Sequence, residues 1–162
     1  TPILQTLAKI PEANIAYLLM IAGIGFTIGN FVSGKLADRS PDLSLTVSLI
    51  GQVIILLSFS FITVNMITAI VAVFIWGVVN FMIGPPLQMK VMTIADKAPG
   101  LASSINIGAF NLGNALGAAL GGAVITVGLG YAWIPATAAV LSLSALILLG
   151  INRKLVARQA QL

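Results

Sequence analysis

The side chains in this sequence that are able to bind a ligand are amides and an aromatic ring, set within long apolar runs. Trp76 and Asn80 are four residues apart, so they lie on one face of a helix. An aromatic surface beside an amide suits a partly apolar solute, and packing in a helical core explains the same face equally well. We expect this face either to line a cavity or to lie in the core.

A second face of polar and small residues recurs further along the chain, within an arc of about 100° of one helix. Asn114 lies near the middle of its apolar run, and Asn111 is adjacent to the face at an angle of about 60°. Amides at bilayer depth must find a partner or line an aqueous cavity, so both are candidates for solute contact. Gly113, Gly117 and Gly121 are spaced to allow close approach of another helix, and such packing is an equally open explanation. The face comprises Asn106, Phe110, Gly113, Asn114, Gly117 and Gly121.

Two further groups of residues shape the helices that carry these faces. Pro85 and Pro86 remove two backbone donors near the end of the third apolar run, so they should bend or end its helix. The first run is small and mildly polar, which suits close packing or sliding of helices, and Thr27 within it is another candidate for lining a cavity. The small and polar residues of this run are Gly23, Gly25, Thr27, Gly29 and Asn30.

Catalytic chemistry has no evident residues in this sequence. The chain contains no cysteine and no histidine, which removes thiol and imidazole catalysis and the commonest metal ligands. No charged residue lies within an apolar run, so the sequence predicts no enzyme, no metal site and no cofactor. A proton-coupled cycle needs a titratable group within the membrane, and this segment does not supply that group.

The charged residues gather between the apolar runs, most closely at Lys35, Asp38 and Arg39. Asp38 could pair with Arg39 or face the positive N-terminus of a neighbouring helix, as a charge latch. A solvated loop that carries the positive charge of the cytoplasmic side is the simpler alternative. The net charge of +4 comes from basic residues scattered singly, which does not indicate binding to nucleic acid.

The composition predicts an all-α membrane protein. Hydrophobic residues make up 59% of the 162 residues, charged residues 7%, and the mean hydropathy is +1.09, whereas soluble domains carry roughly 25% charge. Polar breaks at 63–65 and 128–130 divide the longest apolar runs into pieces of about the 20 residues that cross a bilayer. The sequence predicts five spanning helices at residues 13–34, 43–64, 67–89, 103–127 and 131–151.

The distribution of Lys and Arg predicts the orientation of these spans. With five spans, Lys9 lies on one side and the other seven basic residues lie on the opposite side, which should be cytoplasmic. Residues 152–162 then form a cytoplasmic tail. An odd number of spans indicates a segment of a longer protein, with residues 1–8 as the end of an earlier helix.

Two stretches of sequence carry a family resemblance. Gly34-Lys35-Leu36-Ala37-Asp38-Arg39, preceded by Gly29-Asn30, resembles the first loop motif of major facilitator superfamily transporters, which occurs in both halves of that family. The stretch 104–118, rich in Asn and Gly, resembles helix eleven of the arabinose-efflux-permease-like, drug/proton-antiporter-type branch. Pro41 and Asp42 replace the later Gly and Arg of the motif, as is usual in the second half. The five spans therefore resemble helices eight to twelve, in the C-terminal half.

The resemblance implies a fold and a function that the residues alone do not. It implies that the five helices form most of one six-helix bundle, partnered by an N-terminal six-helix half and by the lipid of the inner membrane. It implies efflux of a small-molecule substrate such as a sugar or drug, by alternating access with proton antiport. The loop of Gly34, Asp38 and Arg39 would gate the cytoplasmic side. A facilitated uniporter and a non-transporting membrane scaffold subunit are the alternatives.

Overall fold

The computed structural model describes residues 2–159, and this part of the chain is helical throughout except for its connections. No strand occurs within these residues, so the prediction of an all-α fold is confirmed. The helices, in chain order, are α1 (Pro2–Leu7), α2 (Glu12–Arg39), α3 (Pro41–Ile62), α4 (Met66–Phe81), α5 (Gly84–Ile94), α6 (Pro99–Thr126), the 3₁₀ helix η1 (Tyr131–Trp133) and α7 (Ile134–Gln159).

Helix boundaries follow from residues that satisfy or remove backbone hydrogen bonds. Ser40 caps α3, because its hydroxyl accepts from the Leu43 N–H at 3.2 Å. Asn65 begins α4 with a capping box, in which its side chain accepts from the Thr68 N–H at 3.0 Å. Gly128 has φ 81° at the α6 end, a conformation that favours glycine. Both predicted breaks, at 63–65 and 128–130, are therefore confirmed as helix boundaries.

Five helical segments of the described chain are long and apolar enough to cross a membrane, as predicted. The third of these is a single segment, Met66–Ile94, made of α4 and α5 with a bend at Met82 and Ile83. The predicted effect of Pro85 and Pro86 is thus confirmed, but it falls about one helical turn earlier than the prolines. The reason is that a proline removes the hydrogen bond to the carbonyl four residues before it.

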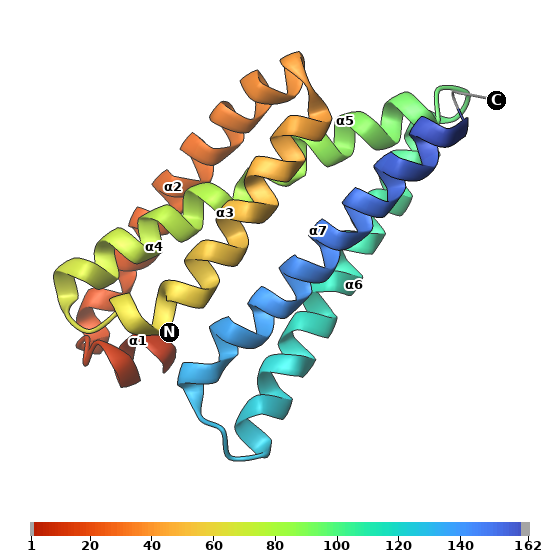
Figure 1. Cartoon of the computed structure of the whole chain (residues 1–162). Coiled ribbons are helices and arrows are strands. Elements are labelled where there is room, and N and C mark those ends of the chain that lie inside the picture. Colours follow the sequence, from red (N-terminus) through yellow and green to blue (C-terminus); the bar gives the residue numbers. More distant parts are fainter. Residues whose placement is uncertain (1, 160–162) are drawn as a thin grey trace.

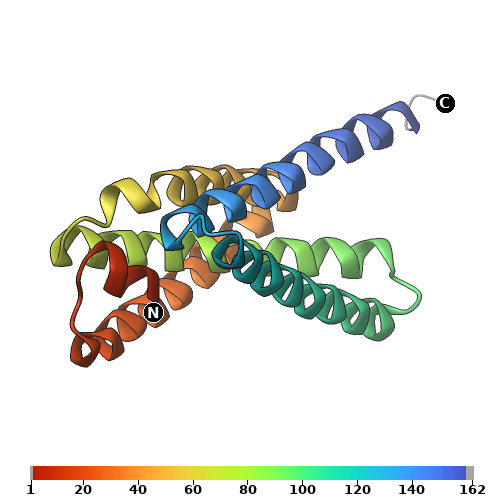
Figure 2. The same cartoon turned by 90° about the horizontal axis from the view of Figure 1, so that it is seen from below.

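Figure 1 and Figure 2 show the arrangement of the helices from two sides. Helices α2, α3 and α4 pack together and α7 packs along α3, whereas α6 contacts α5 and diverges from α7 beyond the connection between them. The closest approach is between α2 and α4. A Cβ atom added at Gly29 would lie 2.0 Å from the Val78 carbonyl oxygen, and one at Gly25 would lie 2.7 Å from that of Phe74. The close packing expected of the first run is therefore confirmed at these glycines.

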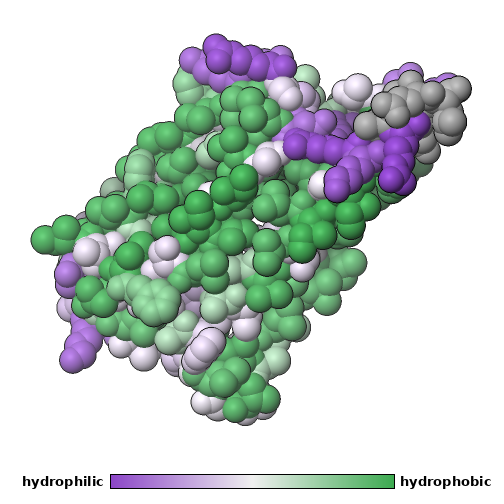
Figure 3. Space-filling view, in the orientation of Figure 1, coloured by the Kyte–Doolittle hydropathy of each residue, from purple (hydrophilic) through white to green (hydrophobic). Residues whose placement is uncertain are grey.

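Apolar side chains form the core and also cover the outside of the molecule. One buried cluster lies between α1, α2 and α4 and includes Leu18, Ala69 and Val73. A smaller cluster joins α3 to α7 through Ile55, Leu56 and Ala139. The space-filling view is apolar over most of its surface, with hydrophilic residues gathered at the ends (Figure 3). Such a surface is stable in lipid rather than in water.

Two expected boundaries differ in the structure. Residues 35–42, expected as a loop, are helical except for Ser40, because α2 runs to Arg39 and α3 begins at Pro41. Helix α7 continues to Gln159, so residues 152–159 of the expected tail are helical. Residues 160–162 of that tail, and Thr1 of the expected upstream helix end, lie outside the described residues.

Candidate functional site

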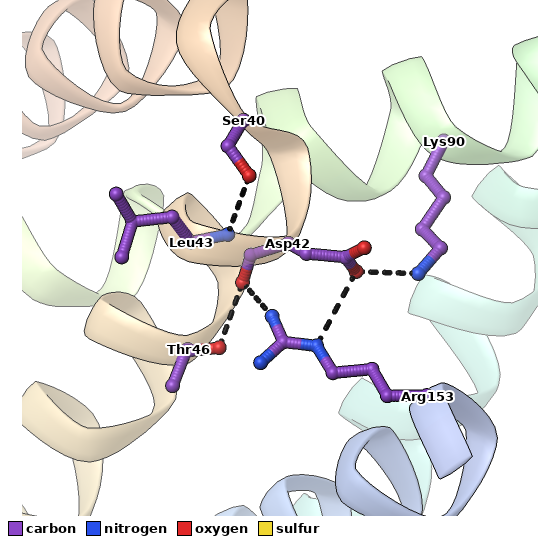
Figure 4. Close-up of polar contacts among 6 residues, drawn as sticks. All are labelled: Ser40, Asp42, Leu43, Thr46, Lys90 and Arg153. Carbon is purple, nitrogen blue, oxygen red and sulfur yellow. Dashed lines mark hydrogen bonds and ion pairs between the residues drawn. The ribbon is translucent and has the colours of Figure 1, made fainter. Parts of the chain in front are cut away.

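Three charged residues from three helices meet at one end of the molecule, and we call them the ion cluster: Asp42, Lys90 and Arg153. Asp42 Oδ1 lies 2.5 Å from Lys90 Nζ and 3.7 Å from Arg153 Nε. Arg153 also donates from its guanidinium to the Asp42 backbone carbonyl, which the Thr46 hydroxyl contacts as well. Figure 4 shows Asp42 between the two cations. The cluster therefore connects α3, α5 and α7.

The local sequence places Asp42 in the first turn of α3, directly after the cap at Ser40 and the proline at 41. A carboxylate there faces the positive end of the helix dipole, which favours its ionised form. Asp42 precedes the uncharged run that crosses the membrane. The hydrogen bond from Lys90 lowers the pKa of the Asp42 carboxyl, and the charge of Arg153 adds to this effect. The side chain of Asp42 is 45% exposed, so water screens these pairs in part.

The expected gating residues lie beside this cluster but do not take part in it. Asp38 and Arg39 are exposed in the last turn of α2, and within residues 2–159 neither forms an ion pair. Gly34 borders open space, since an added Cβ would meet no described atom within 4 Å. The pairing suggested for Asp38 and Arg39 is therefore corrected. The carboxylate that pairs is Asp42, one of the residues by which the sequence departs from the loop motif.

Trp76 borders an apolar cavity of about 320 Å³ between α1, α2, α3, α4 and α7. Its ring is 5.8 Å from that of Phe26 in an edge-on arrangement. Asn80 is not among the lining residues; it lies one helical turn from Trp76 and accepts a hydrogen bond of 3.4 Å from Gln52 Nε2. The expected face thus divides into a cavity-lining ring and an interhelical amide pair. The lining residues are Ile3, Leu4, Leu18, Leu19, Ala22, Leu56, Phe59, Val73, Trp76, Ile134, Pro135 and Ala138.

Gln52 is buried beside this cavity, and its carbonyl oxygen Oε1 has no hydrogen-bond partner among the described residues. Leu56, one turn away on α3, lines the cavity as Trp76 does on α4. The Gln52–Asn80 pair therefore lies one turn below the cavity wall on both helices. An apolar chamber with amides at its edge can hold a solute that has an apolar body and a polar end.

The other predicted candidates lie on surfaces that the described chain leaves open. Thr27 is exposed on α2, where its hydroxyl bonds to the Gly23 carbonyl at 3.1 Å. Asn111 and Asn114 are exposed on α6. Gly113 and Gly117 have no described atom within 4 Å of an added Cβ, and Gly121 approaches only Ile134, at 3.8 Å. Helix packing at Gly113 and Gly117 stays a prediction, because no helix of residues 2–159 covers them.

Sequence reasoning missed a polar network between α5 and α6. Asn106 Nδ2 donates to Gln88 Oε1 at 2.6 Å, and Gln88 Nε2 donates to Ser103 Oγ at 2.7 Å. Asn106 is buried, whereas its neighbours on the same stripe are exposed. No local pattern around Gln88 indicates that it takes part in a network. Only its pairing with the Asn106 amide, on another helix, could have identified it. The pair fixes α6 to the segment that also carries Lys90.

No protein-family model matches the chain, but comparison with known proteins finds several similar transporters. The chain is 47% identical over 148 residues to the inner membrane transport protein YdhP of Escherichia coli strain K12, covering 91% of this chain and 38% of YdhP. It is 34% identical over 168 residues to YtbD of Bacillus subtilis strain 168, named an uncharacterized MFS-type transporter, covering 99% of this chain and 41% of YtbD. It is 29% identical over 132 residues to a probable sugar efflux transporter of Helicobacter acinonychis, covering 80% of this chain and 34% of that relative.

The names of these relatives, as transport proteins, agree with the apolar helices described above. The chain spans about two fifths of the length of the first two. Its five apolar helices match the type of element from which such transporters are built. The chain is therefore similar, over most of its length, to MFS-type transporters, and this similarity is consistent with the resemblance to the C-terminal half of the major facilitator superfamily.

Proposed function

We propose that the protein is an inner-membrane transporter that exports a small sugar-like or drug-like solute in exchange for protons. The described helices would supply most of one bundle, which rocks against an N-terminal bundle in an alternating-access cycle. The names of YdhP, an inner membrane transport protein, and of the probable sugar efflux transporter support this assignment. Proton exchange is the finer part of the proposal, and its titratable group would lie outside residues 2–159.

The amides of α6 are the structural observation that carries the proposal. Only 6% of the apolar window of α6 is buried within this structure, against 33% for α3. Asn111 and Asn114 are therefore uncovered near the middle of a spanning helix. An amide in hydrocarbon is costly unless it meets a partner or water. A solute pathway between two bundles would supply that water, and the solute would bond to the amides as it passes.

The ion cluster fits this cycle as a brace. Asp42, Lys90 and Arg153 all belong to the described helices, so their bonds stiffen one bundle rather than joining two. While its bonds are closed, the cluster ties these three helices together at one end, so that they rock as one body.

Transport in inside-out membrane vesicles tests the proposal. Vesicles that contain the protein as encoded should accumulate a sugar or drug from a broad panel when a proton gradient is imposed, and a protonophore should abolish this accumulation. Asn114→Ala should reduce the flux by about tenfold, because one good hydrogen bond to the solute is lost. Ser104→Ala, an exposed α6 residue that bonds only to its own helix, is the matched control and should leave flux unchanged. Absence of proton-linked flux across the panel would count against antiport.

Cysteine accessibility separates transport from the two alternatives. Asn114→Cys should react with a membrane-impermeant thiol reagent, and added solute should slow this reaction. Leu112→Cys is the control, since Leu112 is equally uncovered but lies on the opposite side of α6 and should face lipid. A silent Asn114→Cys together with no flux would favour a scaffold subunit. Solute flux that ignores the proton gradient would favour a facilitated uniporter.

A further inference from the structure

The bend between α4 and α5 leaves a backbone carbonyl without its helical partner. In a continuous helix the Met82 carbonyl would accept from the N–H of residue 86, but Pro86 has none. The helix is interrupted at Met82 and Ile83, and the Met82 residue is buried. A buried carbonyl with no donor costs free energy, so this group needs a partner from elsewhere in the fold.

Two serines from neighbouring helices supply that partner. Ser33 of α2 donates to the Met82 carbonyl at 2.5 Å, and Ser48 of α3 donates to it at 3.1 Å. Both side chains are completely buried, as is Ser44, which lies between them. Three helices therefore meet through hydroxyl groups at the one carbonyl that Pro86 has released. We call Ser33, Ser48 and the Met82 carbonyl the serine clamp.

Besides the Met82 carbonyl, each hydroxyl of the serine clamp has a second acceptor, which belongs to Ser44 of α3. Ser48 Oγ lies 2.7 Å from the Ser44 carbonyl, and Ser33 Oγ lies 3.2 Å from Ser44 Oγ. A hydroxyl carries a single proton, so it cannot donate fully to two acceptors at once. The serines can therefore release Met82 without leaving their own protons unpaired. The cost of release is therefore that of the unpartnered Met82 carbonyl alone, since both hydroxyls keep an acceptor.

The helices on the two sides of the bend are held in different ways. On the α4 side, the backbones touch: a Cβ added at Gly77 would lie 2.7 Å from the Ala22 carbonyl oxygen, which fixes α4 to α2. On the α5 side, Gln88 and Lys90 make polar contacts with α6 and α3, which can be exchanged. Lys90 lies about 10 Å beyond the bend along α5. If α5 rotated by about 15° about the bend, Lys90 would move by roughly 3 Å, which is enough to break its bond to Asp42.

We propose that the serine clamp sets the angle between α4 and α5 and that its release lets α5 swing as a separate lever. The closed clamp holds Lys90 against Asp42, and the released clamp separates them. Helix α6 moves with α5, because Gln88 bonds to both Ser103 and Asn106. The inference concerns the motion of helices within this chain and does not depend on which solute or ion is carried.

Distances between spin labels across the bend test the proposal. The protein as encoded, with any cysteines beyond these 162 residues removed, carries nitroxide labels at Ile67→Cys and Ile94→Cys, two highly exposed positions at opposite ends of the Met66–Ile94 segment. Pulsed electron resonance should give one narrow distance distribution for the parent protein. Adding Ser33→Ala and Ser48→Ala should broaden it and add a second distance. Ser144→Ala, whose hydroxyl bonds only within α7, should leave the distribution unchanged.

Restoring the missing donor provides the decisive variant. Pro86→Ala returns an N–H that can bond to the Met82 carbonyl, so the segment should straighten and the label distance should lengthen. In that background the two serine substitutions should no longer change the distribution or the melting temperature. Pro85→Ala restores a donor for a different carbonyl, that of Phe81, and should keep the sensitivity to the serine substitutions. Equal effects of the serine substitutions with and without Pro86, or no change of distance in any variant, would overturn the proposal; if the double serine variant does not fold, each single variant gives the same comparison.

Discussion

At the scale of single residues, position in a helix decides which carboxylate is useful. Asp38 and Asp42 are four residues apart, yet Asp38 ends α2 in solvent while Asp42 begins α3 opposite two cations. The difference arises at Ser40, which ends one helix and caps the next. The contact with Lys90 and Arg153 depends on helices distant in sequence, so no local motif could reveal it.

Asp42→Asn should therefore destabilise the protein more than Asp38→Asn. The Asp42 substitution removes the charge that Lys90 and Arg153 share, and partly exposed pairs of this kind are worth about 1 kcal/mol in total. The Asp38 substitution removes no ion pair within the described residues and should change the free energy of unfolding by less than about 0.5 kcal/mol. Thermal unfolding in detergent measures both. Equal melting temperatures for the two variants would contradict the role given to the ion cluster.

The acid side of the stability profile should carry a contribution from Asp42. Its pKa is lowered in the folded protein from the ordinary 3.8. The group therefore stabilises the fold at pH values above its unfolded pKa, and this stabilisation is lost as the pH falls below 3.8 through the folded pKa. Melting temperatures recorded between neutral pH and pH 3 should fall less steeply for Asp42→Asn than for the parent protein. Parallel profiles would show that Asp42 titrates normally.

At the scale of helices, the α2–α4 contact is set by glycines with no room for a side chain. Gly29→Ala would place its methyl group 2.0 Å from the Val78 carbonyl oxygen, so the two backbones would have to separate. Overpacking of this kind costs about 1–3 kcal/mol. Gly23→Ala, on the same helix with no described atom within 4 Å, should be neutral or stabilising by up to about 1 kcal/mol. Melting temperatures of the two variants check the contrast, and a neutral Gly29→Ala would refute the close contact.

Hydropathy, turn residues and prolines predicted most of the elements. The breaks at 63–65 and 128–130 were readable because capping and positive φ are local properties of the chain. The bend at Met82 was misplaced by about a turn, since the prolines act on carbonyls that precede them. Residues 35–42 were predicted as a loop because charged residues indicate exposure to solvent. Exposure does not exclude helix, and both helices continue into this charged region.

The candidate site was only partly readable from the sequence. The spacing of Trp76 and Asn80 indicated a face that either lines a cavity or lies in the core, and the structure places the Trp76 ring at a cavity wall. The partner of Asn80 could not be predicted, because Gln52 lies on another helix whose rotation no single-helix pattern determines. The shared acceptor of Ser33 and Ser48 could not be predicted either. Serines are ordinary residues in spanning helices, and the Met82 carbonyl that both contact lies at the end of another helix.

At the scale of the whole molecule, the ion cluster requires the start of α3 and the last turns of α7 to lie on one side of the membrane. Cysteines placed at Arg39 and Lys154 should both react with an impermeant reagent in inside-out vesicles, on the side predicted to be cytoplasmic. Cysteines at Val64 and Leu129, which are exposed in the opposite connections, should react only in right-side-out preparations. Labelling of Arg39→Cys and Lys154→Cys from different sides would contradict the five-span arrangement.

The single residue between α2 and α3 has a consequence for how the protein is made. Because Ser40 alone connects α2 to α3, one helix cannot remain outside the bilayer while the other inserts. The two helices must therefore be integrated during synthesis as one hairpin. An epitope inserted at Ser40 would allow α2 and α3 to insert separately. The longer connection between α5 and α6 should accept such an insertion without this effect.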